Sequence, residues 1–278
     1  MKNLLKKIFF ALMVFLLPLN VSAKSQNVTI DGDHGKLAAV LQTPDGLEKF
    51  PLVIICHGFN ADKDYPLLKF LADDLETRGI ASIRFDFNGH GQSDGEFQAM
   101  TIPNEIADAK CVFDYVRRLP NVTNIGVTGH SQGGVVTSML AGELGAKKIR
   151  AIVLFAPSAI LRDNVLRGEL FHIKFDVFNP PEYIEISTPY GNRKVGREYI
   201  VTLQKLPIYE TAEKFTGPAL MIHGTGDTRV PYTNSQIYKK FFRRGKVKLR
   251  DRDNHAFTGD EQATEKIAAE FFARQLKK

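Results

Sequence analysis

The clearest chemical signal in the sequence is a serine between glycines at the end of a strand-like run. Residues 129–134 read GHSQGG and directly follow the run NIGVT. A serine at a sharp turn from strand to helix has strained backbone angles, and glycines on both sides remove side chains that would collide with the turn. The next helix directs free N–H groups to the point where acyl transfer develops negative charge. Ser131 is therefore the predicted nucleophile. The alternative is a glycine-rich turn in which Ser131 caps the helix.

A nucleophilic serine needs a base, and the base needs an acid that orients it. The expected chain order is serine, acid, histidine. Asp227 in HGTGD and His255 in RDRDNHAF satisfy that order, and each follows a strand-like run. Because parallel strands end at one edge of a sheet, we expect both side chains beside Ser131. Asp253 is the rival acid, although it lies close to His255 along the chain.

Two backbone amides are expected to stabilise the oxyanion of the reaction. The segment HGF at 57–59 follows the first buried strand-like run, so its loop should direct the amide of Phe59 toward the substrate carbonyl. The second amide is that of Gln132, next to the nucleophile. Both roles belong to the main chain, so they do not depend on the side chains.

Three further polar residues have types that suit catalysis but are better explained as loop residues. His57 is expected to organise its loop through a hydrogen bond. Asp86 and His90 lie in FDFNGHGQSDG at 85–95, where a structured loop near the site is the favoured interpretation.

Strand and helix patterns alternate along most of the chain, which is typical of a mostly parallel sheet with helices on both faces. NVTI and KLAAVLQTP are expected to form a strand pair joined by the turn DGDHG. The later strand-like runs are PLVIICHG, IASIRFDF, NIGVTGHS, IRAIVLFAP, PALMIHG and KVKLRD. Helices are predicted over 65–78, 101–119, 132–144 and 233–243 and from about Glu261, with Thr101 as an N-cap.

The alternation stops between about 158 and 207. This stretch is too long for an ordinary connection inside a compact domain, and it is rich in proline and aromatic residues. A disordered insertion would contain fewer aromatic and apolar residues. The stretch is therefore predicted to be an inserted cap over the carboxyl edge of the sheet.

Residues 1–23 have the features of an export signal. Lys2, Lys6 and Lys7 precede an apolar run of about a dozen residues, and VSA at 21–23 offers small residues for cleavage near Ala23. A short N-terminal membrane anchor is the alternative, but the run is shorter than the roughly 20 residues that span a bilayer. We expect a periplasmic or secreted protein of residues 24–278, with no stable membrane anchor.

Composition narrows the range of partners. The formal net charge of +6 includes the signal lysines, and no basic cluster is interleaved with aromatic residues, so a nucleic-acid partner is not expected. Cys56 and Cys111 have no neighbours at metal-ligand spacing and are predicted to be buried free thiols. No metal or organic cofactor is required by the predicted chemistry. The oligomeric state stays open, and a homodimer is one option.

The combination HGF, FDFNGHGQSDG, GHSQGG, HGTGD and NHAF resembles the α/β-hydrolase superfamily over essentially the whole mature chain. More narrowly, RFDFNGHG, GHSQGGVV, LPIYE and HGTGDT resemble the bacterial cinnamoyl (feruloyl) esterases. The resemblance implies an α/β-hydrolase fold with a short inserted cap and a triad of Ser131, Asp227 and His255. It also implies that Asp163 and Tyr199 in the cap meet the phenolic hydroxyl of an aromatic acyl group.

The function expected from these features is a serine carboxylesterase that hydrolyses hydroxycinnamate esters, such as those of plant cell-wall polysaccharides, through an acyl-enzyme. Its partner would be a small-molecule or oligosaccharide ester. One alternative keeps the fold but makes the protein a serine peptidase or a general short-acyl ester hydrolase. Another is a non-catalytic binding protein of the same fold, which would be expected to lack a member of the triad.

Overall fold

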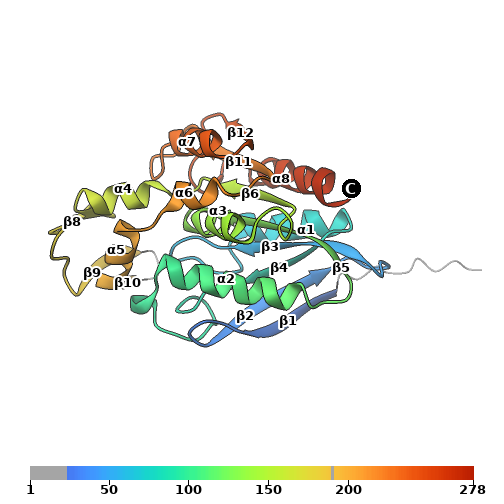
Figure 1. The fold of residues 1–278 in the computed structure, drawn as a ribbon, viewed down its shortest axis with the longest axis horizontal. Helices are drawn as coiled ribbons and strands as arrows, with labels where there is room; N and C mark the ends of the chain where they lie inside the picture. The colour runs from blue at the N-terminus through green and yellow to red at the C-terminus, as the bar shows by residue number, and fades with distance from the viewer. Residues whose placement is uncertain (1–23, 189–190) are drawn as a thin grey trace, which may run out of the picture.

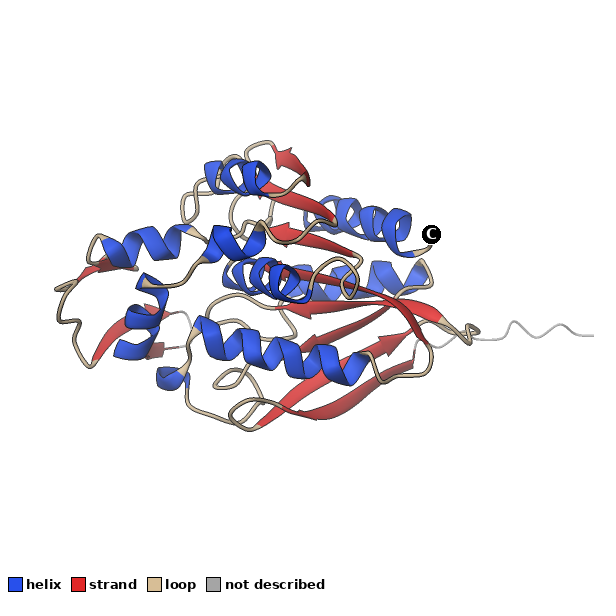
Figure 2. Ribbon diagram, viewed as in Figure 1, coloured by secondary structure: helices blue, strands red, loops and turns tan. Residues whose placement is uncertain are grey.

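A central sheet of eight strands runs through the described part of the protein, with helices on both faces (Figures 1 and 2). The computed structural model describes residues 24–188 and 191–278, so the predicted signal lies outside the described residues. In spatial order the strands are β1 (Lys24–Asp31), β2 (Lys36–Thr43), β4 (Ala81–Phe85), β3 (Phe50–Cys56), β5 (Val122–His130), β6 (Ala151–Phe155), β11 (Pro218–Gly224) and β12 (Arg244–Arg250). β2 pairs antiparallel with β1 and β4, and the remaining pairs are parallel. The predicted mostly parallel sheet is confirmed.

The two faces of the sheet follow from the alternation of side chains along a buried strand. In β3, Leu52 and Ile54 belong to one apolar cluster, whereas Val53 and Ile55 belong to another. The first cluster includes the apolar sides of α2 (Ile102–Val116), α3 (Gln132–Leu144) and α7 (Thr233–Phe241). The second includes those of α1 (Pro66–Thr77) and α8 (Glu261–Leu276). The strands are therefore apolar on both sides, as the continuous runs in the sequence indicate.

Local signals explain where several helices begin. The Thr101 side chain accepts a hydrogen bond from the Asn104 amide at 3.2 Å, which confirms the predicted N-cap of α2. Asp260 caps α8 in the same way, accepting from the Ala263 amide at 3.0 Å. α3 has no side-chain cap. Its first residue follows Ser131 directly, so its N-terminal amides stay available at the end of β5.

The segment between β6 and β11 forms a separate group of elements at one end of the molecule (Figure 1). They are α4 (Ile160–Leu166), β7 (Glu169–Leu170), β8 (Ile173–Lys174), the antiparallel pair β9 (Tyr183–Thr188) and β10 (Gly191–Gly196), and α5 (Arg197–Gln204). The short helix α6 (Ile208–Ala212) follows this group and packs against α3. We refer to residues 158–207 as the cap. α5 packs against α4 and α2, so the cap is anchored on the same face as α3.

The topology predicts where a ligand would bind. After β3 the chain first forms β4 on one side of it and later β5 on the other, and sites in open sheets lie where the strand order reverses in this way. The loop after β3 contains Phe59, and the turn after β5 contains Ser131. Within the described residues, no helix combines the length and the apolar character needed to cross a bilayer.

Both cysteines are free thiols. Cys56 is buried at the end of β3, and burial raises its pKa to about 12. Cys111 in α2 is only half-buried, so the expectation of two buried thiols is wrong for this residue. Cys111 is partly exposed to solvent on the surface of α2.

Candidate active site

Ser131 lies at a strained turn between β5 and α3. Its φ of 56° and ψ of −119° lie in a region that residues with side chains rarely occupy, at a cost on the order of 1–3 kcal/mol. Three backbone hydrogen bonds hold it there. Its amide donates to the Phe155 carbonyl at 2.8 Å, and its own carbonyl accepts from the amides of Gly134 and Ser158.

The glycines around Ser131 are required by close backbone contacts. A Cβ on Gly129 would overlap the carbonyl oxygen of Gly133, and a Cβ on Gly133 would overlap the carbonyl oxygens of Cys56 and His57. The turn after β5 therefore packs directly on the end of β3. This confirms the steric interpretation of the glycine pattern and places Ser131 beside the HGF loop.

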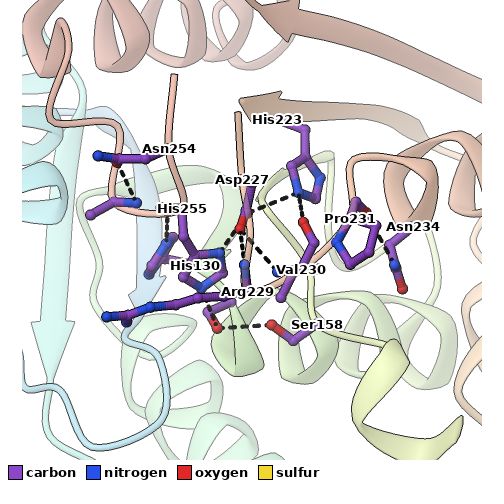
Figure 3. Close-up of polar contacts among 12 residues, drawn as sticks. His130, Ser158, His223, Asp227, Arg229, Val230, Pro231, Asn234, Asn254 and His255 are labelled. Carbon is purple, nitrogen blue, oxygen red and sulfur yellow. Dashed lines mark hydrogen bonds and ion pairs between the residues drawn. The ribbon is translucent and has the colours of Figure 1, made fainter. Parts of the chain in front are cut away.

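The three predicted triad residues come together at the carboxyl edge of the sheet. The Nε2 atom of His255 lies 3.0 Å from Oγ of Ser131. The Nδ1 atom of His255 lies 2.7 Å from Oδ2 of Asp227. Figure 3 draws the contact between these two side chains. Asp227 follows β11 and His255 follows β12, so neighbouring strand ends supply the acid and the base.

Asp227 is held as an anion by several donors. The amides of Arg229 and Val230 donate to Oδ1, both at 2.9 Å, while His223 and His255 donate to Oδ2. Burial by itself raises the pKa of the Asp227 carboxyl, but the hydrogen bonds from the two histidines outweigh burial and hold the pKa well below its usual range. The carboxylate can therefore fix the tautomer of His255 and stabilise the imidazolium that forms when His255 takes a proton.

His223 is a second histidine on the acid that sequence reasoning did not assign to the site. It is fully buried at the end of β11, with Nε2 3.1 Å from Oδ2 of Asp227 and 2.9 Å from the Val230 carbonyl oxygen. Its Nδ1 contacts the Ser235 hydroxyl at 2.7 Å. Because Nε2 faces two acceptors, it carries the proton and donates to both. The sequence signal was its position in HGTGD, four residues before the acid.

His130 holds the backbone of His255, the predicted base, in position. Its Nε2 donates to the backbone carbonyl of His255 at 2.8 Å, and its ring stacks on Tyr65 with centroids 5.2 Å apart. Burial lowers the pKa of His130 to about 3, so the ring is neutral at ordinary pH. The residue before the nucleophile thus positions the loop that carries the base, which was also missed.

The two amides predicted to stabilise the oxyanion are those of Phe59 and Gln132. No acceptor within the described residues takes a hydrogen bond from the amide of Phe59 or of Gln132. Phe59 follows β3 and Gln132 begins α3, so both amides belong to the loops that meet at Ser131. Two amides without partners beside a nucleophile suit a developing negative charge.

The Gln132 side chain links the site to α2 and to the cap. Its Nε2 donates to both carboxyl oxygens of Glu105, at 2.8 and 2.9 Å, and its Oε1 accepts from the Tyr199 hydroxyl at 2.7 Å. All three side chains are buried. Burial raises the pKa of Glu105 well above its usual range, although the Gln132 hydrogen bond opposes the shift. This network holds Gln132, whose amide is the second predicted oxyanion donor.

The structure places the two cap residues in different environments. Tyr199 on α5 is fully buried, and its hydroxyl donates a hydrogen bond to Oε1 of Gln132. This geometry supports a role inside the protein for Tyr199 rather than contact with a phenolic substrate. Asp163 lies exposed on α4.

Asp253, the alternative acid, and His57 both form hydrogen bonds that stabilise their own loops. Asp253 accepts from the amides of Asn254 and Gly259, so it braces the loop that carries His255 and does not contact the imidazole. His57 accepts from the Phe87 amide at Nε2 and donates to the Gly58 carbonyl at Nδ1. It organises its loop, as predicted.

Solved structures similar to this protein match it over most of its length. The structure of Est1E from Butyrivibrio proteoclasticus with bound ferulic acid is 32% identical to this chain, with a TM-score of 0.85, and the match covers 90% of this chain and 100% of Est1E. The chain belongs to the α/β-hydrolase superfamily. A second Est1E structure matches at 30% identity, with a TM-score of 0.82 over 91% of this chain and 99% of Est1E.

A family model, a further solved structure and a curated protein are also similar to parts or to the fold of this α/β-hydrolase. The family model described as "Serine aminopeptidase, S33" matches residues 48–176. A dienelactone hydrolase from Anabaena variabilis, 16% identical with a TM-score of 0.66 over 91% of this chain and 99% of its own, shows the same fold. An uncharacterized 31.7 kDa protein of the traX-finO intergenic region of Escherichia coli is 33% identical over 128 residues, which are 45% of this chain and 44% of that protein. The chain thus spans less than half the length of this curated relative.

Proposed function

We propose that this α/β-hydrolase is a serine carboxylesterase that releases hydroxycinnamic acids from their esters. The observation that carries the proposal is the hydrogen-bonded chain from Ser131 through His255 to Asp227, with successive distances of 3.0 and 2.7 Å. Ser131 attacks the ester carbonyl while His255 takes its proton and passes it to the leaving alcohol. The amides of Phe59 and Gln132 hold the oxyanion, and water then hydrolyses the acyl-enzyme.

Aromatic side chains beside the oxyanion loop support an aromatic acyl group. The ring of Phe59 lies 4.5 Å from that of Phe171 in the cap and 5.4 Å from that of Phe97, measured between centroids. Phe171 is partly exposed, so its face is accessible from solvent. Aromatic rings favour offset or edge contacts with a further ring. The bound ferulic acid of the related Est1E structure supports the same class of ligand.

A panel of methyl esters tests the acyl preference with the alcohol held constant. We expect kcat/KM for methyl ferulate to exceed that for methyl butyrate at least tenfold, because burial of an aromatic ring contributes on the order of 2 kcal/mol. Ser131→Ala is the control and should abolish both activities. Equal or faster hydrolysis of the butyrate ester would contradict the hydroxycinnamate preference and leave the esterase activity standing.

A serine aminopeptidase is the second candidate, favoured by the description of the matching family model. That model matches less than half of the chain, whereas the likeness to Est1E covers 90% of it. Aminoacyl p-nitroanilides separate the two candidates. Turnover of the anilides without turnover of methyl esters would support the peptidase.

We further propose that the protein acts outside the cytoplasm, after removal of residues 1–23. The positive n-region, the short apolar run and the small residues before Lys24 support this. The mass of the protein from the native host should correspond to a chain that begins near Lys24. An intact N-terminus in a cytoplasmic fraction would contradict export.

A further inference from the structure

A second serine hydroxyl lies against the nucleophile. Ser158 follows β6 at the carboxyl edge of the sheet, is 2% exposed, and has its Oγ 2.8 Å from Oγ of Ser131 (Figure 3). Its amide also donates to the Ser131 carbonyl at 3.1 Å. Among the described residues, the Ser158 hydroxyl has no hydrogen-bond partner other than Ser131. The amide and the hydroxyl of Ser158 therefore both contact Ser131.

The partners of the triad fix the direction of this hydrogen bond. In the neutral imidazole of His255, Nδ1 carries the proton because it faces the Asp227 carboxylate, so Nε2 is an acceptor. The Ser131 hydroxyl then donates to Nε2. Oγ of Ser131 has lone pairs left over, and the Ser158 hydroxyl donates to one of them.

We propose that Ser158 is a further catalytic residue that acts in deacylation. The inference rests on the proposed acyl-enzyme mechanism. In the acyl-enzyme, Oγ of Ser131 is an ester oxygen whose electrons are delocalised into the carbonyl, so it accepts hydrogen bonds weakly. Water attacks the acyl carbon and gives one proton to His255, and the tetrahedral intermediate collapses with cleavage of the bond between the acyl carbon and Oγ. The electron pair returns to Oγ, which takes the proton back from Nε2, while the Ser158 hydroxyl keeps its own proton and donates to Oγ again.

This role predicts an asymmetry between the two halves of the reaction. The hydrogen bond is present in the free enzyme, weak in the acyl-enzyme and regained as Oγ leaves. Its removal should therefore slow deacylation and leave acylation unchanged or slightly faster. Loss of one neutral hydrogen bond corresponds to a decrease of roughly fivefold to tenfold in rate. When deacylation limits turnover, kcat and KM should fall together and kcat/KM should be preserved.

The test compares Ser158→Ala with the wild type on p-nitrophenyl acetate. Acylation is measured in single turnover with enzyme in excess, and deacylation is measured from the decay of isolated acyl-enzyme by intact mass. Ser158→Thr retains the hydroxyl and should restore most of the deacylation rate. Ser138→Ala is the matched control, since Ser138 is a buried serine of α3 whose Oγ donates to the Val135 carbonyl, away from the triad.

The expected result is a fivefold to tenfold longer acyl-enzyme lifetime for Ser158→Ala alone, with a wild-type acylation rate. Equal losses in both steps would show a merely structural role, and an unchanged lifetime would show none; either outcome overturns the proposal. If Ser158→Ala folds poorly, Ser158→Thr is compared with the wild type instead. Because it keeps the hydroxyl, an acyl-enzyme lifetime fivefold to tenfold longer than that of the wild type would contradict a role for the hydroxyl. A wild-type protein that forms no acyl-enzyme would instead contradict the proposed function.

Discussion

Two buried aspartates at the carboxyl edge of the sheet have similar surroundings and different partners. Asp86 follows β4, and its carboxylate accepts from the amides of Lys63 and Gln92 and from Nζ of Lys63. Asp227 follows β11 and accepts from the amides of Arg229 and Val230. Each carboxylate is thus held by two backbone amides near a strand end. Residue type, burial and position do not distinguish them.

The two carboxylates differ in one basic side-chain partner, which is Lys63 for Asp86 and His255 for Asp227. The ammonium of Lys63 is a point charge that neutralises Asp86 inside a closed loop. The imidazole of His255 has a second nitrogen, so it contacts Asp227 at one side and Ser131 at the other. Only this arrangement can transmit the effect of the carboxylate to a reacting oxygen. Asp86 should therefore determine stability, and Asp227 should determine the rate.

Asp227→Asn should have the largest effect. The amide cannot fix His255 in the required tautomer or stabilise its imidazolium, so kcat should fall about ten-thousandfold, the size typical of such a change in a serine triad. Steady-state hydrolysis of methyl ferulate measures it. Asp253→Asn, which changes the neighbouring loop aspartate in the same way, should lose less than about tenfold. The reverse ranking of the two variants would assign the acid to Asp253.

The same substitution at Asp86 should mainly lower stability. Asp86→Asn leaves the buried ammonium of Lys63 with only the exposed carboxylate of Asp64, 3.6 Å away, and breaking a buried pair costs about 3–5 kcal/mol. Urea unfolding followed by circular dichroism would report this loss. The folded fraction should keep kcat close to that of the wild type. A large fall in kcat with unchanged stability would contradict the division between the two aspartates.

The buried histidine His57 contacts the loop that contains Asp86 and should make the free energy of unfolding depend on pH. His57 accepts from the amide of Phe87, and burial lowers its pKa to about 4. The unfolded chain takes up this proton near pH 6.5 and the folded chain only near pH 4, so the contribution of His57 is present above pH 6.5 and is lost as pH falls toward 4. The loss amounts to about 3 kcal/mol.

A difference between variants isolates this contribution, because the raised pKa of the Asp108 carboxyl, about 6, acts in the opposite direction over the same range. Between pH 7 and pH 4.5, the free energy of unfolding of His57→Gln should fall by about 2–3 kcal/mol less than that of the wild type. Urea titrations at both pH values measure the difference. An identical pH dependence of the two proteins would show that His57 keeps its ordinary pKa in the folded state.

The positions of the three triad residues could be predicted from the sequence. Ser131, Asp227 and His255 could be predicted because each follows a strand-like run, and the ends of parallel strands meet at one edge. Gly129 meets a local steric need, because a Cβ there would overlap the carbonyl oxygen of Gly133, whereas Gly133 is required by its contact with the distant residues Cys56 and His57. The same logic predicted the sheet, and both faces of β3 are covered as its continuous apolar run indicates.

The contacts between elements could not be predicted in this way. Glu105 lies in the first turn of α2, where a carboxylate commonly faces solvent, and only the packing of α2 against α3 places it on Gln132. Tyr199 reaches Gln132 because α5 of the cap docks on α2. Ser158 follows a strand-like run as the triad residues do, so its position alone could have identified it.

The central claim is that Ser131 forms a covalent acyl-enzyme with hydroxycinnamate esters. Acid quenching of the protein during turnover of methyl ferulate, followed by proteolysis and peptide mass spectrometry, tests it most directly. We expect one feruloyl group on the peptide that contains Ser131 and none in Ser131→Ala. Turnover of the ester with the acyl group on another residue, or undiminished turnover by Ser131→Ala, would contradict it.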